Sequence, residues 1–165
     1  MEVLESENTG QVKYAGFWLR FVAYLIDDII LGAIGFVISL PFIGTIIFSG
    51  IVLSDMDSCE ESKFLGIAGI VGTALLLIMT ITAVGWLYYA LMESSKQQAT
   101  LGKMALGLKV TDMEGKKISF ARATGRYFGK IISNMIFMIG YILAGLTEKK
   151  QALHDMIAGC LVIRT

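Results

Sequence analysis

Charge, histidine and cysteine are scarce in this 165-residue chain, and each scarcity excludes something. Only 17% of the residues are charged and the net charge is zero, so the composition gives no support to nucleic-acid binding. His154 is the only histidine, and Cys59 and Cys160 lie far apart outside any Cys-x-x-Cys motif. No serine–histidine–acid or paired-glutamate pattern is present. The sequence therefore predicts no metal, no cofactor and no enzymatic site.

Apolar residues are abundant instead. They make up 55% of the chain, and the mean hydropathy is +0.69. A soluble core of this size does not need such an excess, whereas a bilayer does. The first 13 residues are polar and acidic, and no small-residue cleavage site follows a short apolar core, which argues against a secretory signal peptide. We expect a single integral membrane domain over residues 1–165, with 1–13 as a polar tail.

The first apolar run, Phe17–Leu53, is too long for one straight crossing, because at about 1.5 Å per residue it measures about 55 Å against a bilayer core of about 30 Å. Pro41, the only proline, disfavours helical geometry in the residue before it. The preferred first span is therefore residues 17–40, with Phe42–Leu53 as an outer extension or a partial helix. A rival placement, Ile29–Leu53, would leave the charges of the first run outside the membrane.

Two further apolar stretches follow. Lys63 and Glu93 enclose 29 uncharged residues, which predicts a second span over 64–92. Residues 131–146 are short for a full crossing and contain Gly140 and Gly145, so a third segment that is embedded or re-entrant is preferred over one that crosses.

Three charges interrupt the first run: Arg20, Asp27 and Asp28. An ionisable residue inside a span costs roughly 2.5–3.5 kcal/mol, so each needs a partner, a water-filled cavity or a function. Positions 20 and 27 share one helix face about 10 Å apart, which is too far for a direct contact, so both should turn towards other helices. Arg20 is read as a snorkelling side chain, a structural ion pair or a transport residue, and Asp27 as a structural partner or a proton or cation site. Asp28 should face a neighbouring helix or a second subunit.

The basic residues predict the orientation. Residues 55–63 hold one basic residue among four acidic ones, whereas residues 93–130 hold eight: Lys96, Lys103, Lys109, Lys116, Lys117, Arg122, Arg126 and Lys130. The positive-inside rule places residues 93–130 and the N-terminus in the cytoplasm of a bacterium and the acidic loop outside. The prediction is a multi-pass protein of the cytoplasmic (inner) membrane.

The basic segment has its own local pattern. Residues 105–119 read as a strand, a glycine-containing turn and a second short strand. Residues 121–130 read as an amphipathic helix whose basic stripe would lie on an anionic leaflet, and that stripe is Arg122, Arg126 and Lys130. Residues 159–164 are a candidate strand for pairing with 106–111. The predicted fold is all-α in the membrane, with two full spans, a third embedded segment, a small cytoplasmic β-hairpin and an amphipathic helix.

Several motifs together resemble the RDD family of small bacterial membrane proteins, from about residue 14 to 163. They are Arg20-x6-Asp27, the segment GKMALGLKV at 102–110 with DMEGKKIS after it, and LHDMIAG at 153–159. The resemblance implies that Arg20, Asp27 and Asp155 are the residues that name the family. The chain departs from the family pattern at Cys160 and Leu101. A role in transport, including sodium/proton exchange, is proposed for some members.

His154, beside Asp155, is read as a structural histidine or as a pH switch. Two functions then remain open. The first is a non-catalytic membrane module that binds another membrane protein or forms a homo-oligomer. The second is a transporter, such as a cation/proton antiporter for a monovalent cation, that uses Arg20 and Asp27; since two or three spans enclose little volume, this reading requires an oligomer.

Overall fold

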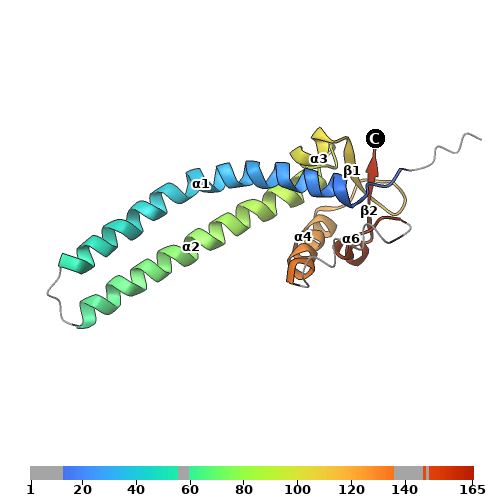
Figure 1. Cartoon of the computed structure of the whole chain (residues 1–165). Coiled ribbons are helices and arrows are strands. Elements are labelled where there is room, and N and C mark those ends of the chain that lie inside the picture. The colour runs from blue at the N-terminus through green and yellow to red at the C-terminus, as the bar shows by residue number, and fades with distance from the viewer. Residues whose placement is uncertain (1–12, 56–59, 136–146, 148) are drawn as a thin grey trace, which may run out of the picture.

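The computed structural model describes residues 13–55, 60–135, 147 and 149–165. Two long helices dominate it, α1 (Phe17–Asp55) and α2 (Glu60–Glu93). They pack against each other and extend to one side of a compact group of shorter elements (Figure 1). We call residues 29–55 and 60–81 of this pair the arm, and the remaining described residues the head.

Both long helices are long and apolar enough to cross a membrane. The prediction of two such helices is therefore confirmed. The predicted end of the first span at Leu40 is wrong as a helix boundary, because α1 continues through Pro41 to Asp55. Proline inside a helix removes one backbone hydrogen bond and costs about 3 kcal/mol, but packing on a neighbouring helix can hold the chain helical. α1 packs on α2, and near the far end of the pair the Leu53 side chain lies directly on Gly66.

Five short elements complete the head. They are α3 (Leu101–Ala105), β1 (Leu108–Asp112), α4 (Phe120–Met135), α6 (Leu153–Ala158) and β2 (Cys160–Arg164). β1 and β2 form a two-stranded antiparallel sheet in which Leu108 lies opposite Arg164 and Asp112 opposite Cys160. The chain just before α1 joins β2, because the Ala15 amide donates to the Val162 carbonyl at 2.9 Å.

The predicted hairpin is only partly right. Asp112 does begin a turn: its carboxylate accepts the Lys116 amide at 2.7 Å, and Gly115 has a φ of +79°, which glycine adopts without strain. The residues after this turn form no strand, however, and β1 pairs with β2 instead. The other predicted pairing, of residues 159–164 with 106–111, is the one observed. The C-terminal strand β2 therefore lies in the head, directly beside the part of the basic segment that forms β1.

Small side chains and strand residues form the core of the head. They are Ala15, Ala23, Ala90, Leu108, Val110, Ile118, Ala123, Cys160 and Val162. The predicted third segment, 131–146, is described only over 131–135, where it is the end of α4. Residues 136–146 lie outside the described part of the chain, as does the predicted polar tail up to residue 12.

Candidate functional site: a buried ion-pair network

Arg20, on the first turn of α1, is joined to Asp155 on α6. Its Nη1 forms an ion pair with Asp155 Oδ2, its Nε donates to the Ala15 carbonyl at 2.9 Å, and its Nη2 donates to the Lys150 carbonyl at 2.6 Å. Asp155 is fully buried. Two of the residues singled out from the sequence are thus brought into direct contact across 135 positions of chain.

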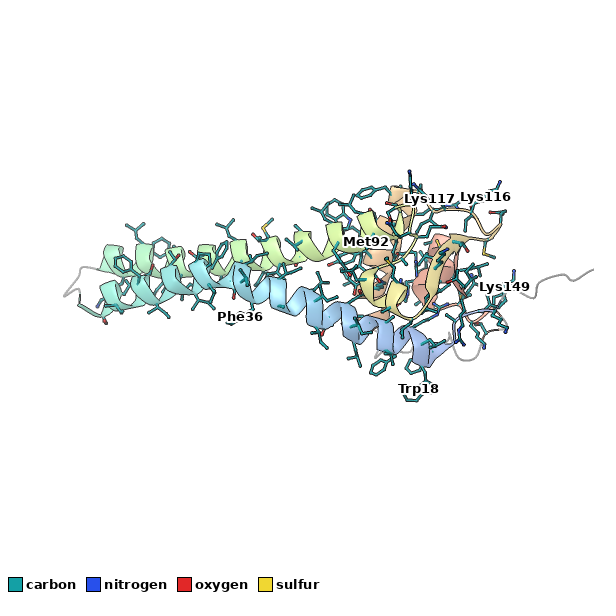
Figure 2. The ribbon with its side chains drawn as sticks, turned by 90° about the horizontal axis from the view of Figure 1, so that it is seen from above. Trp18, Phe36, Met92, Lys116, Lys117 and Lys149 are labelled. Atoms are coloured by element: carbon teal, nitrogen blue, oxygen red, sulfur yellow. The ribbon has the colours of Figure 1, made fainter. Side chains whose placement is uncertain are left out.

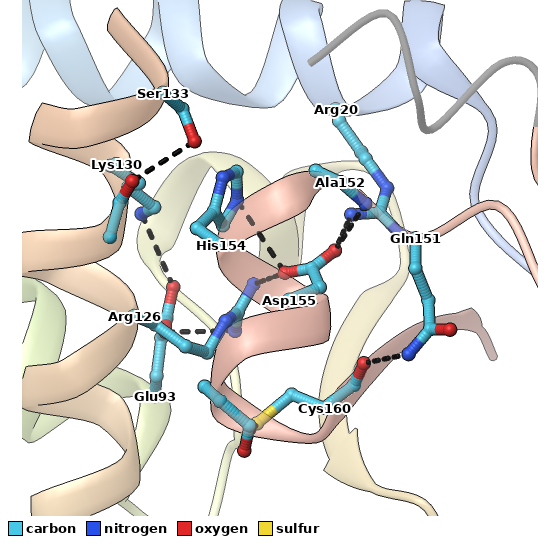
Figure 3. A network of polar contacts seen from close by, with 12 residues as sticks. Arg20, Glu93, Arg126, Lys130, Ser133, Gln151, Ala152, His154, Asp155 and Cys160 are labelled. Atoms are coloured by element: carbon cyan, nitrogen blue, oxygen red, sulfur yellow. Dashed lines mark hydrogen bonds and ion pairs between the residues drawn. The ribbon is translucent and has the colours of Figure 1, made fainter. Parts of the chain in front are cut away.

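Arg126 of α4 lies at the centre of the network (Figure 3). One arm of its guanidinium donates to Asp155 Oδ1 at 2.5 Å and the other to Glu93 Oε2 at 2.9 Å. Only 1% of the Arg126 surface is exposed. A planar guanidinium presents five N–H donors in a rigid fork, so each of its arms can hold a different carboxylate.

Two lysines complete the set around Glu93. Lys103 Nζ lies 2.6 Å from Glu93 Oε1, and Lys130 Nζ lies 3.6 Å from the same oxygen. Lys130 Nζ also lies 3.8 Å from the centre of the Tyr89 ring, within the range of a cation–π contact. The ion pairs therefore connect α1, α2, α3, α4 and α6.

The sequence reading of this basic segment was wrong in one respect. Arg126 and Lys130 were expected on a membrane surface, yet they point into the head, and only Arg122 of the stripe is exposed. The physical reason is that Glu93 and Asp155 offer buried partners, which a leaflet surface cannot match. A sequence signal did exist: Arg126 and Lys130 share a helix face with small residues, whereas Phe128 lies on another face.

Four cations share two carboxylates in this network, and the imbalance appears in the pKa values. Burial alone would raise the pKa of Asp155, but Arg126 and Arg20 beside it outweigh burial and hold it well below its usual range. Burial lowers the pKa of Lys130 to about 7, although the Glu93 carboxylate opposes the change. Burial also lowers the pKa of Lys103. Burial therefore weakens the charge of both lysines, whereas the cations beside Asp155 keep that carboxylate ionised.

Asp27 belongs to a separate group of hydrogen bonds. Its carboxylate accepts the Tyr88 hydroxyl at 2.8 Å, the Thr100 hydroxyl at 2.5 Å and the Gly102 amide at 2.7 Å. Asp27 is 1% exposed and joins α1 to α2 and to the start of α3. As expected from the spacing, it turns away from Arg20 towards another helix. Both residues nevertheless line one cavity of about 40 Å³, together with Lys103, Lys130 and His154.

Asp28 is placed differently from its neighbour. It is exposed and lines a cleft of about 520 Å³ between α1 and α2, with Gly32 and Gly35 on the same side. It takes no part in the ion pairs described above. Of the five residues singled out from the sequence, Arg20, His154 and Asp155 therefore lie together, Asp27 lies beside them and Asp28 lies apart. Four further members of the buried site, Glu93, Lys103, Arg126 and Lys130, carry no sequence signal that separates them from ordinary surface charges except the helical stripe of Arg126 and Lys130.

The described residues of this site contain neither a metal-binding group nor an accessible thiol. Within the described residues, no group of three or more histidine, cysteine, aspartate or glutamate side chains is placed to hold a metal ion. The Cys160 thiol is buried, and burial raises its pKa, which makes it less reactive at neutral pH.

His154 is buried beside the network, with Nε2 at 3.5 Å from Asp155 Oδ1. Burial lowers its pKa to about 3, and the nearby cations Arg126 and Lys130 add to this, while Asp155 opposes it. In the unfolded chain His154 takes up a proton near pH 6.5, whereas in the folded protein it does so only near pH 3. The unfolded state therefore binds more protons between these values, and the free energy of unfolding should fall as the pH drops through this window.

We therefore expect the free energy of unfolding to decrease by about 1.5 kcal/mol between pH 6.5 and pH 5, above the range in which carboxylates titrate. His154→Gln removes the titrating group and should flatten the slope over this interval, whatever its effect on stability at pH 7. Unfolding in detergent, followed at several pH values for both proteins, measures the two slopes. Equal slopes would show that His154 is not the group responsible.

The fold and this site define a class of protein: a pair of long apolar helices carrying a small head whose interior is charged. The chain belongs to the RDD family, whose family model matches residues 14–159. It is 40% identical over 151 residues to the uncharacterized protein YxaI of Bacillus subtilis (strain 168), covering 92% of this chain and 97% of that protein. It is 29% identical over 156 residues to the uncharacterized membrane protein YteJ of the same organism, covering 91% of this chain and 80% of that protein. No solved structure matches.

Proposed function

We propose that this RDD family protein is a non-catalytic accessory module of the bacterial cytoplasmic membrane. Two membrane helices carry a cytoplasmic head, and the head binds a second membrane protein or another copy of the chain. The observation that carries the proposal is the network around Arg126, in which each carboxylate is held by at least two cations. Charges paired in this way hold a fold together, because removing either partner leaves an uncompensated buried charge.

The head favours the rival placement of the first span. Ile29–Leu53 is a run of 25 uncharged residues, about 37 Å of helix, which suffices for a hydrocarbon core of about 30 Å. On α2 the head reaches as far as Thr82, whose carbonyl accepts the Tyr127 hydroxyl at 3.3 Å. In this placement Arg20 and Asp27 lie in the head rather than in lipid, and the arm alone crosses the membrane.

The distribution of charge supports a cytoplasmic head. Lys116, Lys117 and Lys149 lie at the end of the head away from the arm, whereas Phe36 points outwards from the arm (Figure 2). Such a basic end belongs on the cytoplasmic side by the positive-inside rule. Labelling of a cysteine at position 57 from outside the cell would check this orientation. Lys116, Lys117 and Arg122 are exposed and are the residues we propose for contact with the partner.

The surroundings of Asp27 argue against ion transport. A proton or cation site must release its ligand, but the Asp27 carboxylate already accepts three hydrogen bonds from groups on α2 and α3. These three hydrogen bonds tie the carboxylate into the packing of α1 against α2 and α3, which favours a structural role for Asp27 over a site that takes up and releases an ion.

The decisive measurement uses the purified protein in liposomes with an imposed pH gradient. We expect addition of sodium, lithium or potassium to dissipate the gradient no faster than in protein-free liposomes. Asp27→Asn and the matched control Asp28→Asn, which changes the exposed neighbouring carboxylate, should behave in the same way as the wild type. Cation-dependent dissipation by the wild type that is lost in Asp27→Asn and kept in Asp28→Asn would establish the antiporter function and overturn the proposal.

A further inference from the structure

The polarity of α4 is the reverse of that of a helix at a water-exposed surface. Its inward face carries two cations among small residues: Ala123, Arg126, Gly129 and Ser133 are buried, and Lys130 is half-buried. Its outward face is apolar: Phe128 is 51% exposed and Ile131 is 43% exposed. A helix that covers a protein in water places its apolar stripe inwards and its charges outwards.

Two of the three charges of α4 face inwards. Its sequence contains three charged residues, of which Arg126 and Lys130 are held by Glu93 inside the head. The third, Arg122, lies about 120° around the helix from Phe128. The part of the helix surface that Phe128 and Ile131 share therefore carries no charged side chain, because Lys130 points inwards to Glu93.

The position of α4 identifies what covers this face. α4 runs across the direction of the arm, on the side of the head that faces the arm (Figure 1). Its contacts with α2 are at the start of the head: the Tyr127 hydroxyl donates to the Thr82 carbonyl at 3.3 Å, and Trp86 Nε1 donates to the Thr124 hydroxyl at 3.2 Å. α4 therefore lies at the level where the arm enters the head, and its exposed apolar residues add to those exposed along the arm.

We propose that α4 is an interfacial helix whose outward face, with Phe128 and Ile131, inserts into the lipids of the leaflet next to the head. An amphipathic helix lying in this plane buries its apolar face at the boundary between headgroups and acyl chains. The bilayer then covers one side of the ion-pair network, and Arg126 and Lys130 point away from lipid to their carboxylate partners. This inference rests on the proposed placement of the arm in the membrane.

Spin-label accessibility in nanodiscs tests the proposal. In a Cys59→Ser, Cys160→Ser background, a nitroxide is attached at position 128 and, in a second protein, at position 131. Serine suits position 160 because the Cys160 thiol lies 3.3 Å from the Ala158 carbonyl, which a hydroxyl can also reach. Oxygen, which concentrates in lipid, and a water-soluble nickel chelate then report the surroundings of each label.

Two control positions calibrate the result. Val37 on the arm is 64% exposed and Lys116 in the β1 turn is exposed. We expect positions 128 and 131 to resemble position 37, with the ratio of oxygen to nickel accessibility severalfold higher than at position 116.

Three results would overturn the proposal. High nickel accessibility at 128 and 131 would place the face in water. Low accessibility to both reagents would mean that protein covers the face, either a second copy or another segment of this chain. If position 37 also lacks lipid exposure, the placement of the arm fails together with the α4 proposal; if position 37 is lipid-exposed and 128 is not, only the α4 proposal fails.

Discussion

Arg126→Met should lower the free energy of unfolding by about 3–5 kcal/mol, the loss typical of breaking a buried ion pair from one side. Methionine fills similar space without charge, so Asp155 loses one of its two arginines and Glu93 is left with the two lysines. Unfolding in mild detergent, followed by tryptophan fluorescence, measures the loss. Arg126→Lys should lower the free energy of unfolding by less than Arg126→Met, because it keeps the positive charge. Some loss should remain, because lysine lacks the planar fork that holds both carboxylates.

Arg122→Met is the matched control for this experiment. It removes the same type of charge from the same helix, one turn earlier, at an exposed position. Exposed substitutions of this kind usually change stability by no more than about 0.5 kcal/mol. Similar losses at positions 122 and 126 would mean that the network contributes nothing beyond an ordinary surface charge.

Gly102→Ala is expected to cost about 3 kcal/mol through a different mechanism, the close approach of α3 to α1. A Cβ at position 102 would overlap the Ala23 carbonyl oxygen and lie 3.0 Å from the Asp27 carboxylate. Because the first obstacle is backbone, α3 must move away from α1. This movement strains the packing and breaks the Gly102 amide hydrogen bond to Asp27.

Gly125→Ala serves as the control for Gly102→Ala. A Cβ at Gly125 meets nothing within 4 Å. In a helix interior alanine is favoured over glycine by up to about 1 kcal/mol, so this variant should be neutral or slightly more stable. Thermal unfolding of the two variants in the same detergent compares them. A Gly102→Ala protein as stable as Gly125→Ala would show that the contact between α3 and α1 is not tight.

The fold could be predicted where the signal is local in sequence. The apolar runs of α1 and α2 identify the two helices, since each run by itself exceeds the thickness of a bilayer core. Pro41 alone predicts a break at Leu40, yet α1 continues through it, because the effect of a proline also depends on how the helix packs against its neighbours. The partner of β1 was equally undetermined locally: the turn at Gly115 favours a hairpin, and the strand that actually pairs lies some 50 positions later.

The site was only half predictable for a similar reason. Arg20, Asp27 and Asp155 were found through charges in an apolar run and through resemblance to a family. Arg126 and Lys130 were recognised as one helical stripe, but a stripe alone does not say which way it faces. That choice depends on Glu93, 33 positions before Arg126, and on Asp155, 29 positions after it.

The sequence by itself determined that this protein has two long apolar helices, a basic segment after them and the RDD motifs, because hydropathy and motif spacing are properties of contiguous residues. Only the tertiary structure decided that Arg20 and Asp155 meet, that Arg126 joins Asp155 to Glu93, and that α4 turns Arg126 and Lys130 inwards. These outcomes depend on which buried partners the fold brings within a few ångströms. A buried charge is stable only where such a partner is present, and distance along the chain gives no measure of that distance in space.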